Sequence, residues 1–90
     1  MEVLINNLSK DKFEILVNNK QKTMHQVYLS DEVHLEFTNN KISKEELIKF
    51  SFEFLLEREP NTSILSSFEL NIISKYFPEY LLSVKKFCNI

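Results

Sequence analysis

The side chains that could bind a metal ion are two histidines and one cysteine. His25, His34 and Cys88 form neither a C-x-x-C pair nor a closely spaced histidine pair, which are the usual arrangements of zinc ligands. We therefore predict no metal site, with His25 in a strand and His34 between acidic neighbours on the surface. The single cysteine excludes an internal disulfide and is typical of a reducing compartment.

Nucleophilic catalysis would need a serine or cysteine aligned with a base. Ser30, Ser43 and Ser66 each precede a segment in which a helix could begin, so we expect their hydroxyls to cap helices. Cys88 lies near the C-terminus, without a neighbour that would lower its pKa. The chain contains no glycine, which excludes the standard phosphate-binding loop and dinucleotide fingerprint. We predict no cofactor.

Glutamates between residues 45 and 59 could form the paired carboxylates of an acid–base catalyst. They are Glu45, Glu46, Glu53, Glu57 and Glu59. At helical spacing most of them fall on one polar stripe or in a first helical turn, where solvated acids are common. We predict that the protein is not an enzyme, and a small enzyme without a recognisable motif stays as the second alternative.

A helix over residues 44–59 is the clearest structural signal. Ser43 and Glu46 form an S-x-x-E capping box, and Pro60 ends the segment because the residue before a proline is disfavoured in the α region. Leu47, Ile48, Phe50, Ser51, Phe54 and Leu55 would share one face. Apolar side chains continue round the helix, which must therefore be covered on two sides.

The second apolar side of this helix is carried by Phe52 and Leu56, with Phe50 at the opposite margin. A 90-residue chain has little surface left to cover so wide a stripe. We predict that these three residues mediate contact with a second copy of the chain. The alternative is that segment 66–77 packs against this side within the monomer.

The remaining patterns predict an α+β fold. Alternating side chains over residues 12–17 and 22–29 indicate an antiparallel β-hairpin, whereas residues 2–9 are too few to classify. Residues 31–37 alternate like a strand, yet Ser30 followed by acids is typical of a helix start. The hairpin would be followed by three to four helices around residues 44–59, in one domain of residues 1–90.

The C-terminal helices are predicted from local start and stop signals. Ser66 and Glu69 form a second capping-box pattern, which predicts a helix through Phe77. Pro78 ends that helix and can begin the next, which would place Tyr80, Leu81, Val84 and Phe87 or Cys88 on one face.

The charge pattern argues against a general nucleic-acid or anionic-membrane surface. The formal net charge is −2 and both signs are interspersed. The start of the chain has too short an apolar run for a signal peptide, and no later run is long enough to span a membrane. We predict a cytoplasmic protein with no membrane partner.

Three short motifs carry a resemblance to known sequences. SFEFLLEREP at residues 51–60, IL at 64–65 and YFPEY at 76–80 are similar to a family of small, uncharacterised bacterial proteins. The resemblance implies no activity, cofactor or site residue. It does imply a helix at residues 31–37, against the period-2 pattern.

The order of strand, short helix and capped helix is similar to that of ribbon–helix–helix repressors. In those dimers a two-chain β-ribbon enters the major groove, and outward side chains read base edges. The matching residues here are Met24, Gln26 and Tyr28, of which only Gln26 is suited to reading adenine. Our main interpretation is therefore a self-associating protein-interaction or subunit-type module, with a DNA-binding regulator as the alternative.

Overall fold

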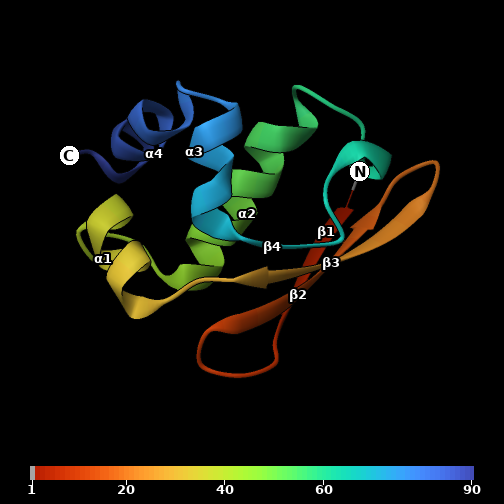
Figure 1. Ribbon diagram of the computed structural model, residues 1–90, viewed down its shortest axis with the longest axis horizontal. Coiled ribbons are helices and arrows are strands. Elements are labelled where there is room, and N and C mark those ends of the chain that lie inside the picture. The colour runs from red at the N-terminus through yellow and green to blue at the C-terminus, as the bar shows by residue number, and fades with distance from the viewer. Residues whose placement is uncertain (1) are drawn as a thin grey trace.

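The computed structural model describes residues 2–90, which form a four-stranded sheet with its helices on one side (Figure 1). The strand order is β1-β2-β3-β4, with antiparallel pairs except for the parallel pair β3–β4. The strands are β1 (Glu2–Asn7), β2 (Lys12–Asn18), β3 (Lys22–Tyr28) and β4 (Ser67–Glu69). The helices are α1 (Asp31–Thr38), α2 (Lys44–Leu56), α3 (Ile73–Tyr76) and α4 (Tyr80–Cys88), with 3-10 turns at Asn61–Ser63 and Leu70–Ile72. The α+β fold is as predicted.

The predicted hairpin is formed by β2 and β3. Phe13, Ile15 and Val17 alternate with more exposed residues and are buried under the helices, as the period-2 pattern requires. Residues 2–7, which the sequence left unclassified, add a third antiparallel strand beside β2. Their partly buried side chains, Val3 and Ile5, pack against the edge of the same core.

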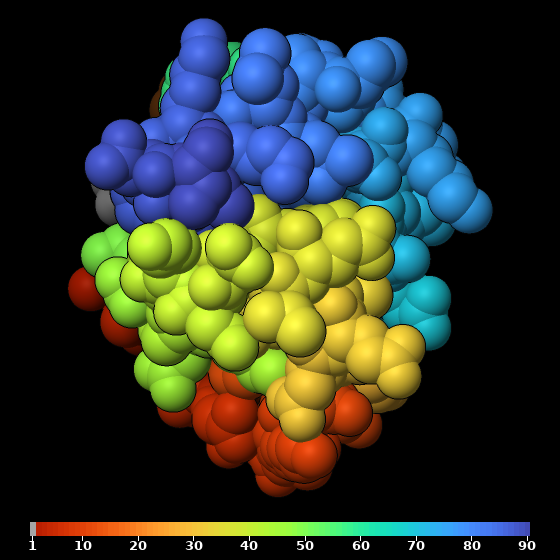
Figure 2. All heavy atoms as spheres, turned by 90° about the vertical axis from the view of Figure 1, so that its left-hand side faces the viewer, coloured from red at the N-terminus to blue at the C-terminus, as the bar shows by residue number. Residues whose placement is uncertain are grey.

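The ambiguous segment after the hairpin is the helix α1. The Ser30 hydroxyl accepts a hydrogen bond from the Val33 N–H, and Asn39 ends the helix in the left-handed conformation with φ of 55°. Figure 2 shows α1 exposed between α4 and the turn that joins β1 to β2. The cap therefore decides between the two interpretations, in favour of the helix.

The central helix α2 begins as predicted at Ser43. The Ser43 hydroxyl accepts from the Glu46 N–H at 3.1 Å, and a Glu46 carboxylate oxygen accepts from the Ser43 N–H at 3.0 Å. The regular helix ends at Leu56, earlier than the predicted residue 59. The Arg58 and Glu59 N–H groups both bond to the Leu55 carbonyl, which tightens the last turn before Pro60.

The predicted helix over residues 66–77 is wrong at its start. Ser66 and Glu69 do not form a capping box, because this segment runs along β3 as β4. The Ser66 carbonyl accepts a hydrogen bond from the Gln26 N–H at 2.8 Å, and Phe68 turns into the core. A 3-10 turn and the four-residue α3 follow. The last predicted helix is present as α4, beginning two residues after Pro78.

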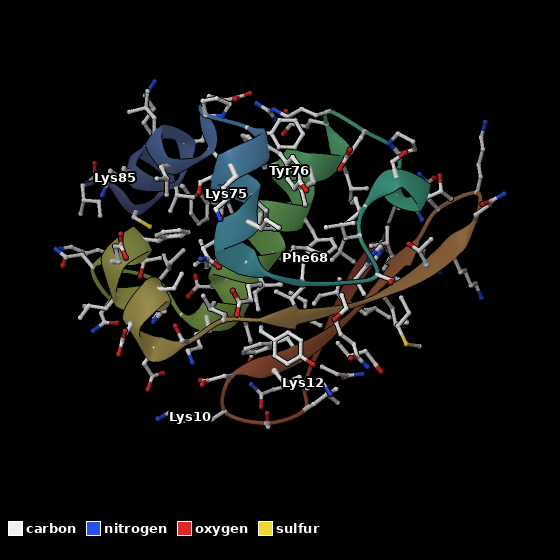
Figure 3. The ribbon with its side chains drawn as sticks, in the orientation of Figure 1. Lys10, Lys12, Phe68, Lys75, Tyr76 and Lys85 are labelled. Atoms are coloured by element: carbon white, nitrogen blue, oxygen red, sulfur yellow. The ribbon has the colours of Figure 1, made fainter. Side chains whose placement is uncertain are left out.

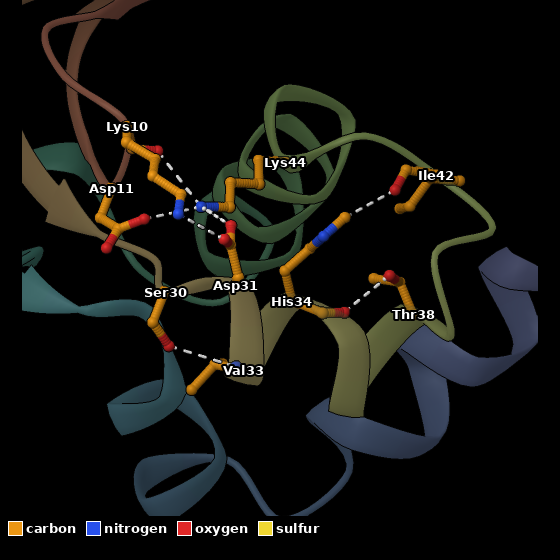
Figure 4. A network of polar contacts seen from close by, with 9 residues as sticks. All are labelled: Lys10, Asp11, Ser30, Asp31, Val33, His34, Thr38, Ile42 and Lys44. Carbon is orange, nitrogen blue, oxygen red and sulfur yellow. Dashed lines mark hydrogen bonds and ion pairs between the residues drawn. The ribbon is translucent and has the colours of Figure 1, made fainter.

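A charged network attaches α1 and α2 to the β1–β2 turn (Figure 4). The Lys44 ammonium lies 2.8 Å from Asp31 and 2.9 Å from Asp11, while Lys10 lies 2.9 Å from the other Asp31 oxygen. Hydrogen bonds from Lys44 and Lys10 lower the pKa of Asp31 to about 2. Lys44 thereby joins the start of both helices to the first turn of the sheet.

Candidate functional site

The residues with catalytic or metal-binding potential make contacts inside the fold. His25 is 2% exposed, and its Nδ1 and Nε2 lie 2.8 Å from the Leu65 carbonyl and 2.9 Å from the Thr23 hydroxyl. Because a carbonyl only accepts, His25 Nδ1–H is the donor to Leu65. Asn61 donates to the same Thr23 hydroxyl, so this chain of bonds holds the segment before β4 against β3.

The other candidate side chains are also engaged locally. His34 Nε2 lies 2.7 Å from the Ile42 carbonyl, which connects α1 with the approach to α2 (Figure 4). Burial raises the pKa of the Cys88 thiol, which opposes formation of a reactive thiolate. Across residues 2–90, no group of three or more His, Cys, Asp or Glu side chains is placed to hold a metal ion.

A buried polar pair lies between α2 and α4. The Ser51 hydroxyl donates to the Leu47 carbonyl at 2.7 Å, and its oxygen lies 2.6 Å from the Tyr80 hydroxyl. Burial raises the pKa of Tyr80, so its phenol stays protonated at neutral pH. The pair joins two helices and has no exposed atom through which it could act on a ligand.

Phe52, predicted to contact a second copy, belongs to the core of the single chain. Its exposed fraction is 0%, and its ring centroid lies 5.4 Å from that of His25 and 6.1 Å from that of Phe68. Phe68 extends from β4 into the space between the sheet and the helices (Figure 3). The interface prediction is therefore wrong for Phe52, because the segment that contains β4 covers this side of α2.

Phe50 and Leu56 are partly exposed but do not form one surface. The Phe50 ring stacks on Phe87 of α4 at a centroid distance of 4.6 Å. Leu56 instead lines a shallow groove with Val3 and Leu4, between α2 and β1. The sequence-predicted patch is thus divided, and only its Leu56 part lies beside the sheet.

The residues of the DNA-binding alternative lie on β3, on the sheet face that carries no helices. Met24 is 53% exposed, Tyr28 is 39% exposed and Gln26 is partly buried. A ribbon–helix–helix dimer needs this strand at an edge, where it can pair with the same strand of a partner. Here β3 lies between β2 and β4, and β4 pairs with its Gln26–Tyr28 half, so β3 is not the free edge strand that such a dimer requires.

A row of apolar side chains crosses the open face of the sheet. Leu4, Leu16 and Met24 are register partners on β1, β2 and β3. Leu4 and Met24 are about half exposed, and Leu16 is partly buried between them. The row therefore reaches the edge of the sheet at Leu4.

The outer edge of β1 is unpaired within residues 2–90. The strand pairs with β2 alone, and the Leu8 N–H donates to the Lys12 carbonyl at 2.9 Å just beyond its end. Because hydrogen-bonded pairs alternate along an antiparallel ladder, the N–H and C=O groups of Val3, Ile5 and Asn7 point to the outer edge. These groups are available to another strand.

A second apolar surface is a groove of about 340 Å³ between the end of α2 and α3. It is lined by Leu55, Glu59, Ser63, Ile64, Leu65, Phe68, Ile72, Ile73, Tyr76 and Phe77. Leu65 is 48% exposed and Tyr76 is 65% exposed at its rim, where Tyr76 projects from α3 (Figure 3). Glu59 is the one charged residue of this lining.

Comparison of the chain with protein-family models, curated proteins and solved structures finds no match. No helix within residues 2–90 has the length and apolar character needed to cross a membrane. Function must therefore be inferred from the surfaces of the chain itself, above all from the outer edge of β1.

Proposed function

We propose that the chain is a cytoplasmic protein-interaction module of subunit type that binds a second copy of itself. The observation that carries this proposal is the outer edge of β1, which pairs with no other strand of residues 2–90. An edge strand presents a row of unpaired donors and acceptors and is a template for another strand. A second copy of the chain has the same free edge strand and could therefore pair with it.

The sequence of β1 supports this use of the edge. Edge strands that avoid association commonly contain lysine or proline, or are interrupted by a bulge. The six residues EVLINN contain neither lysine nor proline, and they pair one to one with β2 without a bulge. Apart from the charged Glu2 at its start, the strand therefore has none of these protective features.

Two further features support a protein partner over a substrate or nucleic acid. The described histidines, the buried serine and the cysteine are engaged or buried in the fold, which favours a non-enzymatic role. The net charge of −2 disfavours duplex DNA as the main partner. The single free cysteine is consistent with a cytoplasmic location.

Sedimentation velocity of the wild-type chain tests this function. We expect a reversible monomer–dimer equilibrium, with dimer predominant at tens of micromolar and monomer at high dilution. A chain that sediments as a monomer throughout this range contradicts the proposed self-association. A fixed mass that does not change on dilution would instead indicate an obligate assembly, with a larger interface than one strand provides.

A further inference from the structure

We infer that β1 pairs antiparallel with β1 of a second copy, about a two-fold axis that passes beside Leu4. The inference rests on the self-association proposed above and specifies its surface. The two sheets would join into one sheet of eight strands, since each copy contributes the four strands of its own sheet. An isologous pairing of this kind closes as a dimer, because each copy uses the same edge, the outer side of its own β1.

Main-chain geometry restricts the possible registers. The outward groups belong to Val3, Ile5 and Asn7, so a residue of this odd-numbered set must face another of the same set. Val3 opposite Ile5 satisfies this requirement, and the same pairing is repeated across the two-fold axis. Leu4 then faces Leu4 at the axis, as a non-hydrogen-bonded pair.

The side chains select this register from its neighbours. With Leu4 opposite Leu4, every apolar residue of the pairing faces an apolar residue, and Glu2 faces Asn6. Moving the pairing in one direction brings Leu4 opposite Asn6, and moving it in the other brings Leu4 opposite Glu2. The register that pairs Leu4 with Leu4 and Val3 with Ile5 is therefore the most complementary one, because it alone leaves no apolar side chain opposite a polar one.

On the open face this register extends the apolar row across the whole dimer. The row Leu4, Leu16, Met24 of one copy would meet the same row of the second copy at the Leu4 pair. In the single chain Leu4 is about half exposed. Its cross-strand contact with another Leu4 would remove apolar surface from water in both copies.

On the helix-covered face the register accounts for Leu56. The groove beside the edge is lined by Val3, Leu4 and Leu56, together with the charged residues Glu2, Lys49, Glu53 and Glu57. Val3 and Ile5 point to this side in each copy, so Ile5 of the second copy would lie opposite Val3 at the mouth of the groove. The partly exposed Leu56 would thus lie next to apolar atoms of the second copy.

Paired charge substitutions at Leu4 test both the edge and the register. Leu4→Lys places two ammonium groups opposite each other at the axis, and Leu4→Glu does the same with two carboxylates. We expect each variant alone to dimerise at least about tenfold more weakly than the wild type, because like charges are directly opposed. An equimolar mixture of the two variants should recover association, since opposite charges then meet.

Met24→Lys is the matched control for this experiment. Met24 lies on the same open face and is 53% exposed, compared with 49% for Leu4, but β2 separates its strand from the edge. We expect Met24→Lys to associate like the wild type and to show an unchanged far-ultraviolet circular dichroism spectrum. A Leu4→Lys variant that is folded and associates as tightly as the wild type would overturn the inference.

Disulfide cross-linking gives a second readout that does not depend on weakened association. The Cα atoms of a non-hydrogen-bonded antiparallel pair lie about 4.5 Å apart, within the range that a disulfide spans. Leu4→Cys should therefore form a covalent dimer under mild oxidation, whereas Asn6→Cys should not, because two Asn6 residues lie on opposite sides of the axis. Both variants are made in a Cys88→Ser background.

The outcomes separate this inference from the proposed function. A wild type that dimerises, together with Leu4→Cys that does not cross-link, would reject the β1 interface and retain self-association. A wild type that stays monomeric would reject both. Cross-linking at Asn6 in place of Leu4 would retain the edge and reject the register.

Discussion

Replacement of Phe52 by alanine is expected to lower the free energy of unfolding by about 3–5 kcal/mol. The ring is fully buried within one chain, between His25 of β3 and Phe68 of β4. The sheet and α2 hold the walls of this site, so the cavity left by the ring would collapse only in part. Urea denaturation of the monomer at low concentration, monitored by circular dichroism, measures the difference.

Phe50→Ala on the same helix is the control for Phe52→Ala. Phe50 is partly exposed and stacks on Phe87, itself about half exposed, so its truncation leaves a surface depression with little cavity. We expect a clearly smaller loss of stability than for Phe52→Ala. A Phe52→Ala variant that is as stable as the wild type would contradict the burial of this ring within one chain.

Tyr80→Ala is expected to destabilise the chain by a similar amount, about 3–5 kcal/mol. Tyr80 is fully buried at the start of α4, and its ring packs edge-on against Phe37 of α1 and Phe54 of α2. It therefore joins three helices at one point. Loss of the ring should loosen α4 from the rest of the fold.

Tyr80→Phe separates the packing of this ring from its hydrogen bond. The Ser51 hydroxyl would keep its bond to the Leu47 carbonyl, so no buried donor is left without a partner. We expect a loss of about 0.5–1.5 kcal/mol, the usual net contribution of one hydrogen bond. Denaturation curves of the two variants under one condition test this difference. If Tyr80→Phe proves as unstable as Tyr80→Ala, the hydroxyl pair and not ring packing dominates.

Short sequence motifs predicted those elements that are stabilised by contacts between neighbours in the sequence. The two S-x-x-E patterns, at Ser43 and Ser66, are equivalent in sequence, yet only the first begins a helix. The second lies beside β3, where the Gln26 N–H requires an acceptor and the Ser66 carbonyl supplies it. Pairing with the distant strand β3 thus outweighs the capping motif at Ser66. The sequence around Ser66 does not indicate this pairing.

The candidate interface at β1 was harder to predict from the sequence, because it too depends on contacts between segments that are distant in the chain. Helical periodicity correctly indicated that α2 is apolar on two sides, but it does not say which segment covers Phe52. The exposed edge of β1 depends on strand order, which follows from pairing across the whole sheet. From the sequence alone, Leu4 was one apolar residue in a short segment, and nothing indicated that it lies at the edge of a sheet.

Amide hydrogen exchange at β1 is the most direct test of pairing between two copies. The Ile5 N–H points to the outer edge and is unpaired in one chain, whereas the Leu4 N–H faces β2 and serves as an internal control. We predict that Ile5 exchange slows as the protein concentration rises through the dimerisation range, while Leu4 stays protected throughout. A dimer in which the Ile5 amide exchanges as fast as in the dilute monomer would contradict the β1 interface.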